Sequence, residues 1–118
     1  MCLITYAGRG TNKNSKKLLE YIENGAKLNK DGHGYAIKRD GSEVIEFIKG
    51  IDKPNELIDF ITKENLTDND ELLVHSRNGN IGKINAENNH PFLISEQEDL
   101  LDITGGSFNI PLLAHNGT

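Results

Sequence analysis

Short apolar runs alternate along this chain with two amphipathic helical patterns, and this alternation is the feature that most constrains the fold. Runs of the kind that form strands are found at 2–7, 34–39, 43–49, 72–75 and 112–115. Asp40-Gly41 separates the second run from the third, and an Asp-Gly pair in that position is a strong signal for a β-hairpin. The pattern is compatible with a single layered domain, residues 1–118, of the α+β class.

The two helical patterns have recognisable beginnings. Ser15 is a candidate N-cap, and Pro54 suits the first turn of a helix. The apolar positions that follow are Leu18, Leu19, Ile22 and Ala26 for the first helix, and Leu57, Ile58 and Ile61 for the second, with Phe60 as a further candidate. Gly25 and Asn29 weaken the first pattern toward its end. We expect each helix to pack an apolar stripe against the strands.

The composition favours a soluble, cytoplasmic protein and argues against nucleic acid as a partner. Lysine and arginine number 13 against 18 acidic residues, which gives a net charge of −5. The lysines at positions 13, 16, 17, 27 and 30 are expected to form a solvated helix face. A single cysteine excludes an internal disulfide framework and fits a reducing compartment. Neither a signal-peptide pattern nor a long apolar segment is present, so no membrane association is expected.

The single cysteine, Cys2, directly follows the initiator methionine. Because its side chain is small, we expect Met1 to be removed, which would leave a thiol and a free α-amine on one residue. An N-terminal amine with a pKa of roughly 7.7 to 8.0 is partly neutral at pH 7 and can accept the thiol proton. Cys2 could therefore be a nucleophile with its own base. A lone cysteine is, however, more often a small buried apolar residue.

Polar clusters lie at the ends of the predicted strands, at residues 29–34 (NKDGHG), 75–82 (HSRNGNIG), 88–92 (NNHPF) and 115–117 (HNG). The planar guanidinium of Arg77 can donate two parallel hydrogen bonds to a carboxylate. The Asn116 side-chain amide and the Gly117 backbone N–H could converge on a developing oxyanion. Ordinary turns would explain each cluster separately.

Taken in order with the second-position cysteine, these clusters resemble the class II glutamine amidotransferase domain, a branch of the N-terminal-nucleophile hydrolases, and especially its small stand-alone members. The resemblance spans almost the whole chain. It implies a four-layer αββα sandwich, in which two stacked sheets are flanked by helices. It also implies hydrolysis of the glutamine side-chain amide through a cysteine thioester, with release of ammonia and glutamate and without a metal or another cofactor.

The resemblance also assigns roles to residues. Cys2 would attack the carboxamide, and Asn116 and Gly117 would hold the oxyanion. Arg77 would bind the α-carboxylate of glutamine, and His90 would support the loop near the site. Relatives usually carry an Ala-Thr pair where this chain has Gly79-Asn80, so the Asn80 amide is expected to take over the threonine's contact with the carboxylate.

Relatives continue beyond the oxyanion motif into further strands, which carry an aspartate for the substrate α-amine, whereas this sequence stops at Thr118. We therefore expect an N-terminal part of the domain, ending just after the strand that precedes the oxyanion motif. A missing strand would leave an exposed sheet edge. The remainder could come from a longer polypeptide or a second chain, or the short form could be stabilised by self-association. Released ammonia would need an acceptor enzyme or the absent portion.

Two other kinds of function stay open at this stage. One is a binding or regulatory module that keeps the fold and binds glutamine or a related ligand without turnover, because no residue can be assigned to the substrate α-amine. The other is a metal site built from His75, His90 and His115, since neutral imidazoles are common zinc ligands. Their spacing matches no tight ligand motif, which makes the metal site the weaker alternative.

Overall fold

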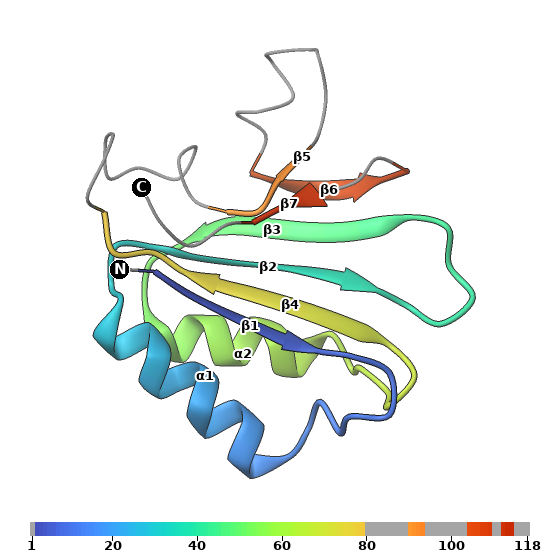
Figure 1. The fold of residues 1–118 in the computed structure, drawn as a ribbon, viewed down its shortest axis with the longest axis horizontal. Helices are drawn as coiled ribbons and strands as arrows, with labels where there is room; N and C mark the ends of the chain where they lie inside the picture. The colour runs from blue at the N-terminus through green and yellow to red at the C-terminus, as the bar shows by residue number, and fades with distance from the viewer. Residues whose placement is uncertain (1, 80–89, 94–103, 110–111, 115–118) are drawn as a thin grey trace.

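The computed structural model describes residues 2–79, 90–93, 104–109 and 112–114. These residues form an α+β fold in which two helices cover one face of a five-stranded antiparallel sheet (Figure 1). The strand order is β1-β4-β2-β3-β6, and β5 and β7 pair in a separate two-stranded sheet. The bounds are β1 Leu3–Ala7, α1 Lys16–Leu28, β2 His33–Lys38, β3 Ile45–Ile51, α2 Pro54–Lys63, β4 Glu71–Ser76, β5 Phe92–Leu93, β6 Gly105–Phe108 and β7 Leu112–Leu113.

Helix α1 begins as its sequence predicts. The Ser15 hydroxyl accepts a hydrogen bond from the backbone N–H of Leu18 at 3.1 Å, which satisfies one of the unpaired donors of the first turn. The helix nevertheless continues through Gly25, which is buried inside it. A Cβ atom at this position would collide with the side chain of Leu3 in β1. Gly25 therefore permits close packing of helix on sheet and is not a stop signal.

Helix α2 begins at Pro54, whose missing N–H has no partner to lose in a first turn. Leu57 and Ile61 are fully buried against the sheet. Phe60, which the sequence pattern placed in the same stripe, is 41% exposed and lies outside it. The inclusion of Phe60 in the apolar stripe was therefore wrong.

The predicted hairpin is confirmed, since β2 and β3 pair antiparallel and the connection contains Gly41 with a φ of +76°. The register then shifts, because His33 pairs with Ile51 whereas Gly34 pairs with Lys49. Gly50, with a φ of +82°, is the extra residue of this bulge. The bulge returns Ile51 to the helix-covered face, whereas Lys49, two residues after Phe47, shares the opposite face with Phe47 by ordinary strand alternation. Lys49 is only 3% exposed there.

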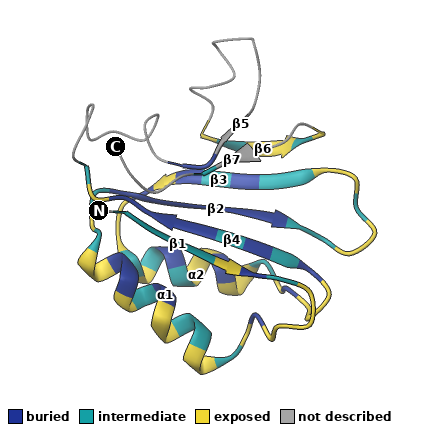
Figure 2. Ribbon diagram, in the orientation of Figure 1, coloured by how far each residue is buried: buried dark blue, intermediate teal, exposed yellow. Residues whose placement is uncertain are grey.

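The two faces of the sheet differ in how completely they are covered (Figure 2). The face under the helices carries the main core, with Tyr35, Ile37, Leu72 and Val74 buried against α1 and α2. On the opposite face Ala36 and Phe47 pack with a few half-buried apolar side chains, Ile45, Leu73 and Phe108. This second face also carries a pocket near the C-terminal ends of β1 and β2 and the N-terminal end of β4.

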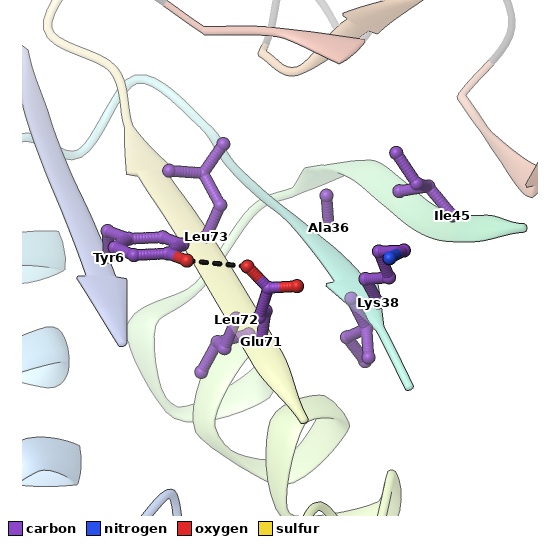
Figure 3. Close-up of a pocket in the computed structure, with 8 residues that line it drawn as sticks. Tyr6, Ala36, Lys38, Ile45, Glu71, Leu72 and Leu73 are labelled. Carbon is purple, nitrogen blue, oxygen red and sulfur yellow. Dashed lines mark hydrogen bonds between the residues drawn. The ribbon is translucent and has the colours of Figure 1, made fainter. Parts of the chain in front are cut away.

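The pocket is lined mainly by Tyr6, Ala36, Lys38, Ile45, Glu71 and Leu73 (Figure 3). The Tyr6 hydroxyl donates a hydrogen bond to Glu71 Oε1 at 2.6 Å. Tyr6 lies near the C-terminal end of β1, whereas Cys2 precedes its first residue. The pocket is therefore at the opposite end of the strands from the predicted nucleophile.

Lys13 corrects the expectation of a solvated lysine face. It precedes α1, and only 1% of it is exposed. Its ammonium donates hydrogen bonds to the carbonyls of Gly8 at 2.5 Å and Asp68 at 2.9 Å, so it joins two connecting segments. The other four lysines of the group are exposed. Among the described residues, no helix is long and apolar enough to cross a membrane.

Candidate active site

The sheet topology brings Cys2 and two of the polar sequence clusters to one end of the molecule. Because β4 runs antiparallel to both β1 and β2, its C-terminal end lies between their N-terminal ends (Figure 1). Cys2 precedes β1, Arg77 follows β4, and the 29–34 segment leads into β2. Segments that are far apart in the sequence thus become neighbours at the same end of three adjacent strands.

The strand register places Cys2 and Arg77 side by side. Leu3 pairs with Ser76 and Ile4 with His75, and continuing the ladder by one residue sets Cys2 opposite Arg77. Leu3 points toward α1, as its approach to Gly25 shows, so Cys2 belongs to the other face. Arg77 follows Ser76 and therefore also belongs to that face. Residues directly opposite each other have Cβ atoms about 4.5–5.5 Å apart. Cys2 is half-buried, and Arg77 is 6% exposed.

The backbone around Arg77 is held by the segment that precedes β2. The Arg77 N–H donates to the Gly32 carbonyl at 2.8 Å, and the Asp31 N–H donates to the Arg77 carbonyl at 2.8 Å. The Asp31 carboxylate then accepts the Gly79 N–H at 2.7 Å. The thiol of Cys2 lies 3.8 Å from the Asn78 carbonyl oxygen, within reach of a weak S–H hydrogen bond. Asp31 and Cys2 are therefore both tied to the segment that follows β4, residues 77–79.

His33 pairs with Ser76, the residue just before this segment, and is fully buried. Burial lowers its pKa, an effect that the charge of Asp52 partly opposes, so the imidazole is neutral near pH 7. Its Nδ1 is 2.9 Å from the Ser76 hydroxyl. Its Nε2 has no hydrogen-bond partner among the described residues. The His33–Ser76 pair links β2 to β4 directly below Arg77 and adds no positive charge.

A pair of histidines lies on the same face as Cys2 and Arg77. The His75 and His90 rings have centroids 4.3 Å apart with an interplanar angle of 44°, and both residues are buried. The His90 carbonyl lies directly over Gly34, where any Cβ would overlap it. This close approach explains why a glycine follows His33 in the 29–34 cluster. The 90–91 segment is thereby held against the sheet beside the site.

Three of the six predicted site residues, Cys2, Arg77 and His90, are brought to this end of the sheet. The other three, Asn80, Asn116 and Gly117, lie outside the described residues, as does His115. In the part of the chain that the structure describes, no three His, Cys, Asp or Glu side chains are grouped closely enough to hold a metal ion.

Sequence reasoning named the 29–34 cluster but gave Asp31 no role. An Asp followed by a glycine at a strand end is a turn signal, and its side chain often accepts a backbone N–H nearby in sequence. Here the donor, Gly79, is 48 positions away, so the local signal could not identify it. The burial of Lys49 was not predicted because lysine is almost always exposed, and strand alternation indicates which face Lys49 shares with Phe47 but not that this face is covered there.

Comparison of the chain with protein-family models, with curated proteins and with solved structures gives no match.

Proposed function

We propose that this chain hydrolyses the side-chain amide of glutamine in the manner of class II amidotransferases, with Cys2 as nucleophile and Arg77 as the carboxylate-binding residue. The observation that carries the proposal is the register of β1 and β4. In this register Leu3 pairs with Ser76, and one further step along the two strands would bring half-buried Cys2 and buried Arg77 opposite each other on the other face of the sheet.

The dimensions of glutamine support this pairing. Four single bonds separate its carboxamide carbon from its α-carboxylate carbon, so the two lie at most about 5 Å apart. The flexible side chain of Arg77 carries its guanidinium several bonds beyond Cβ, so from a position opposite Cys2 it could reach the carboxylate of a molecule of this length. A fork of two hydrogen bonds from Arg77 would orient the carboxylate and leave the carboxamide beside the sulfur.

The chemistry follows from removal of Met1. The free amine of Cys2 takes the thiol proton, and the thiolate forms a bond to the carboxamide carbon. The amine then gives the proton to the leaving nitrogen, and the C–N bond breaks. Ammonia departs, and a γ-glutamyl thioester remains on Cys2. Water cleaves the thioester to glutamate and regenerates the thiol. In this proposal Asn116 and Gly117 donate to the oxyanion, and Asn80 and His90 support substrate binding.

We extend the proposal to an αββα sandwich. The support is the unequal covering of the five-stranded sheet, because both described helices pack on one face. The other face carries Ala36 and Phe47 with half-buried Ile45 and Leu73, an apolar surface suited to packing against a second sheet. Cys2 and Arg77 would then lie between the two sheets at their common end.

The first test is direct. We expect intact mass and N-terminal sequencing to show a chain that begins at Cys2, because a retained Met1 would turn the amine into a peptide N–H with no basic lone pair. The same preparation should release glutamate and ammonia from glutamine in equal amounts. Asparagine, which is one methylene shorter, should react far more slowly because its ends cannot reach both residues.

A different result would favour the binding module. Glutamine binding measured by calorimetry, without glutamate release from a chain that begins at Cys2, would contradict the enzymatic proposal. Activity in a chain that retains Met1 would contradict the role of the amine. Arg9→Lys is a matched control for changes at Arg77, since Arg9 is exposed at the other end of β1.

A further inference from the structure

The Asn78–Gly79 peptide group connects the thiol to a carboxylate. Its carbonyl oxygen lies 3.8 Å from Cys2 Sγ, and its N–H donates to Asp31 Oδ2 at 2.7 Å. In a trans peptide these two groups point in opposite directions, so one rigid plane spans the distance between Cys2 and Asp31. Arg77 immediately precedes this peptide and is itself fixed by two backbone hydrogen bonds to residues 31 and 32.

We infer that Asp31 is a positioning residue that sets the Cys2 thiol and the Arg77 guanidinium at the separation that a bound amino acid requires. The inference rests on the proposed function, since it assigns to Asp31 the alignment of that same site. Asp31 contacts neither reacting atom. It acts through the Asn78–Gly79 peptide on one side and through the Arg77 backbone on the other.

The physical basis is the strength and direction of the Asp31 contact. A hydrogen bond from a backbone N–H to an ionised carboxylate is shorter and stronger than one between neutral groups. Asp31 is half-buried, so water competes with it only in part. Without this bond the Gly79 N–H would be satisfied by solvent, and the 77–79 segment, which carries Arg77 and the Asn78 carbonyl, would lose the hydrogen bond that ties it to the Asp31 side chain. The thiol and the guanidinium would then move independently.

The test compares two reagents that modify Cys2, the only thiol of the chain. A diazoketone analogue of glutamine carries an α-carboxylate and depends on the separation of Arg77 and Cys2. Iodoacetamide carries no carboxylate and depends on the thiol alone. The ratio of the two modification rates therefore measures alignment, whereas a general loss of folding would change both rates together.

We expect Asp31→Ala to lower this ratio, and kcat/KM for glutamine, by about tenfold or more, because small misplacements of positioned groups have large effects on rate. Asp31→Asn keeps an acceptor oxygen for the Gly79 N–H and should stay within about threefold of the parent. Asp59→Ala, the same substitution on the exposed surface of α2, is the control. Amide exchange of Gly79, followed by NMR, should become fast in Asp31→Ala and stay slow in Asp31→Asn.

The outcomes separate the two claims. If the parent chain reacts with the analogue no faster than with iodoacetamide, the proposed function is wrong. Amide exchange of Gly79 in Asp31→Ala then decides whether Asp31 still fixes the 77–79 segment. If the parent prefers the analogue but Asp31→Ala keeps the same ratio, or if Gly79 exchange is the same in both, Asp31 is not the positioning residue. Equal losses in Asp31→Ala and Asp31→Asn would also overturn the hydrogen-bond explanation.

Discussion

Gly34→Ala tests the contact that holds the His90 segment against the sheet. A Cβ at position 34 would overlap the His90 carbonyl oxygen and would also lie 2.9 Å from the Lys49 Cβ and 3.0 Å from the Ile48 carbonyl oxygen. Two of these three neighbours are backbone atoms, and the third is the first side-chain atom of a buried lysine. None can move aside by a simple rotation, so the methyl group must displace the His90 segment or β3.

The expected cost can be estimated from overpacking elsewhere. Forcing an extra methyl group into a filled site typically destabilises a protein by about 1–3 kcal/mol. With an unfolding entropy of roughly 2.1 cal/mol/K per residue, this chain should lose about 4 °C in Tm for each kcal/mol. We therefore expect the Tm of Gly34→Ala to fall by about 4–12 °C. Under the proposed function, glutamine hydrolysis should also decrease, since His90 packs on His75, two residues before Arg77.

Thermal unfolding followed by circular dichroism measures the effect, with Gly8→Ala as the control. The nearest atoms to a Cβ at Gly8 belong to the Tyr6 ring, at 3.2 Å, and Tyr6 is 61% exposed and can turn away. That variant should change stability by less than about 0.5 kcal/mol. A Gly34→Ala protein with the Tm of the parent would show that the His90 segment does not lie against β2 as the structure has it.

Further predictions concern the site and the pH dependence of stability. Cys2→Ala should abolish glutamine hydrolysis with an unchanged circular dichroism spectrum; a tenth of the parent rate would place the chemistry elsewhere. Arg77→Lys should raise KM for glutamine more than it lowers kcat, because the lysine ammonium keeps the positive charge but cannot donate the two parallel hydrogen bonds of a guanidinium to the carboxylate. Asn116→Ala should do the reverse and lower kcat by about a hundredfold or more; a raised KM at unchanged kcat would contradict its oxyanion role. The backbone N–H groups of Thr67 and Asp40 donate hydrogen bonds to the Asp70 carboxylate and lower its pKa. These bonds stabilise the fold fully at pH values above the pKa of Asp70 in the unfolded chain, and the stabilisation is lost as the pH falls through its lower pKa in the folded protein. In chemical denaturation below about pH 4, unfolding free energy should fall more steeply for the parent than for Asp70→Asn, and equal slopes would contradict this.

The secondary structure could be predicted because its signals are local. Ser15 caps α1, Pro54 begins α2, and Asp40-Gly41 turns the hairpin, each through the conformational preference of the residue itself. The short apolar runs at 2–7 and 72–75 placed β1 and β4 within one residue of their observed bounds. The strands β5 and β6 were not predicted, since β5 is short and β6 begins with two glycines that carry no apolar signal.

For the site, the sequence determined which chemical groups are present, and the tertiary structure decided which of them meet. The lone thiol at position 2 and the arginine at the end of a strand are visible in the sequence because their chemistry belongs to the side chain. That Cys2 lies opposite Arg77 depends on the β1–β4 register, and that Asp31 reaches Gly79 depends on the pairing of β2 with β4. Register is a property of two paired strands, fixed by the burial of both faces, and a single run of residues does not encode it.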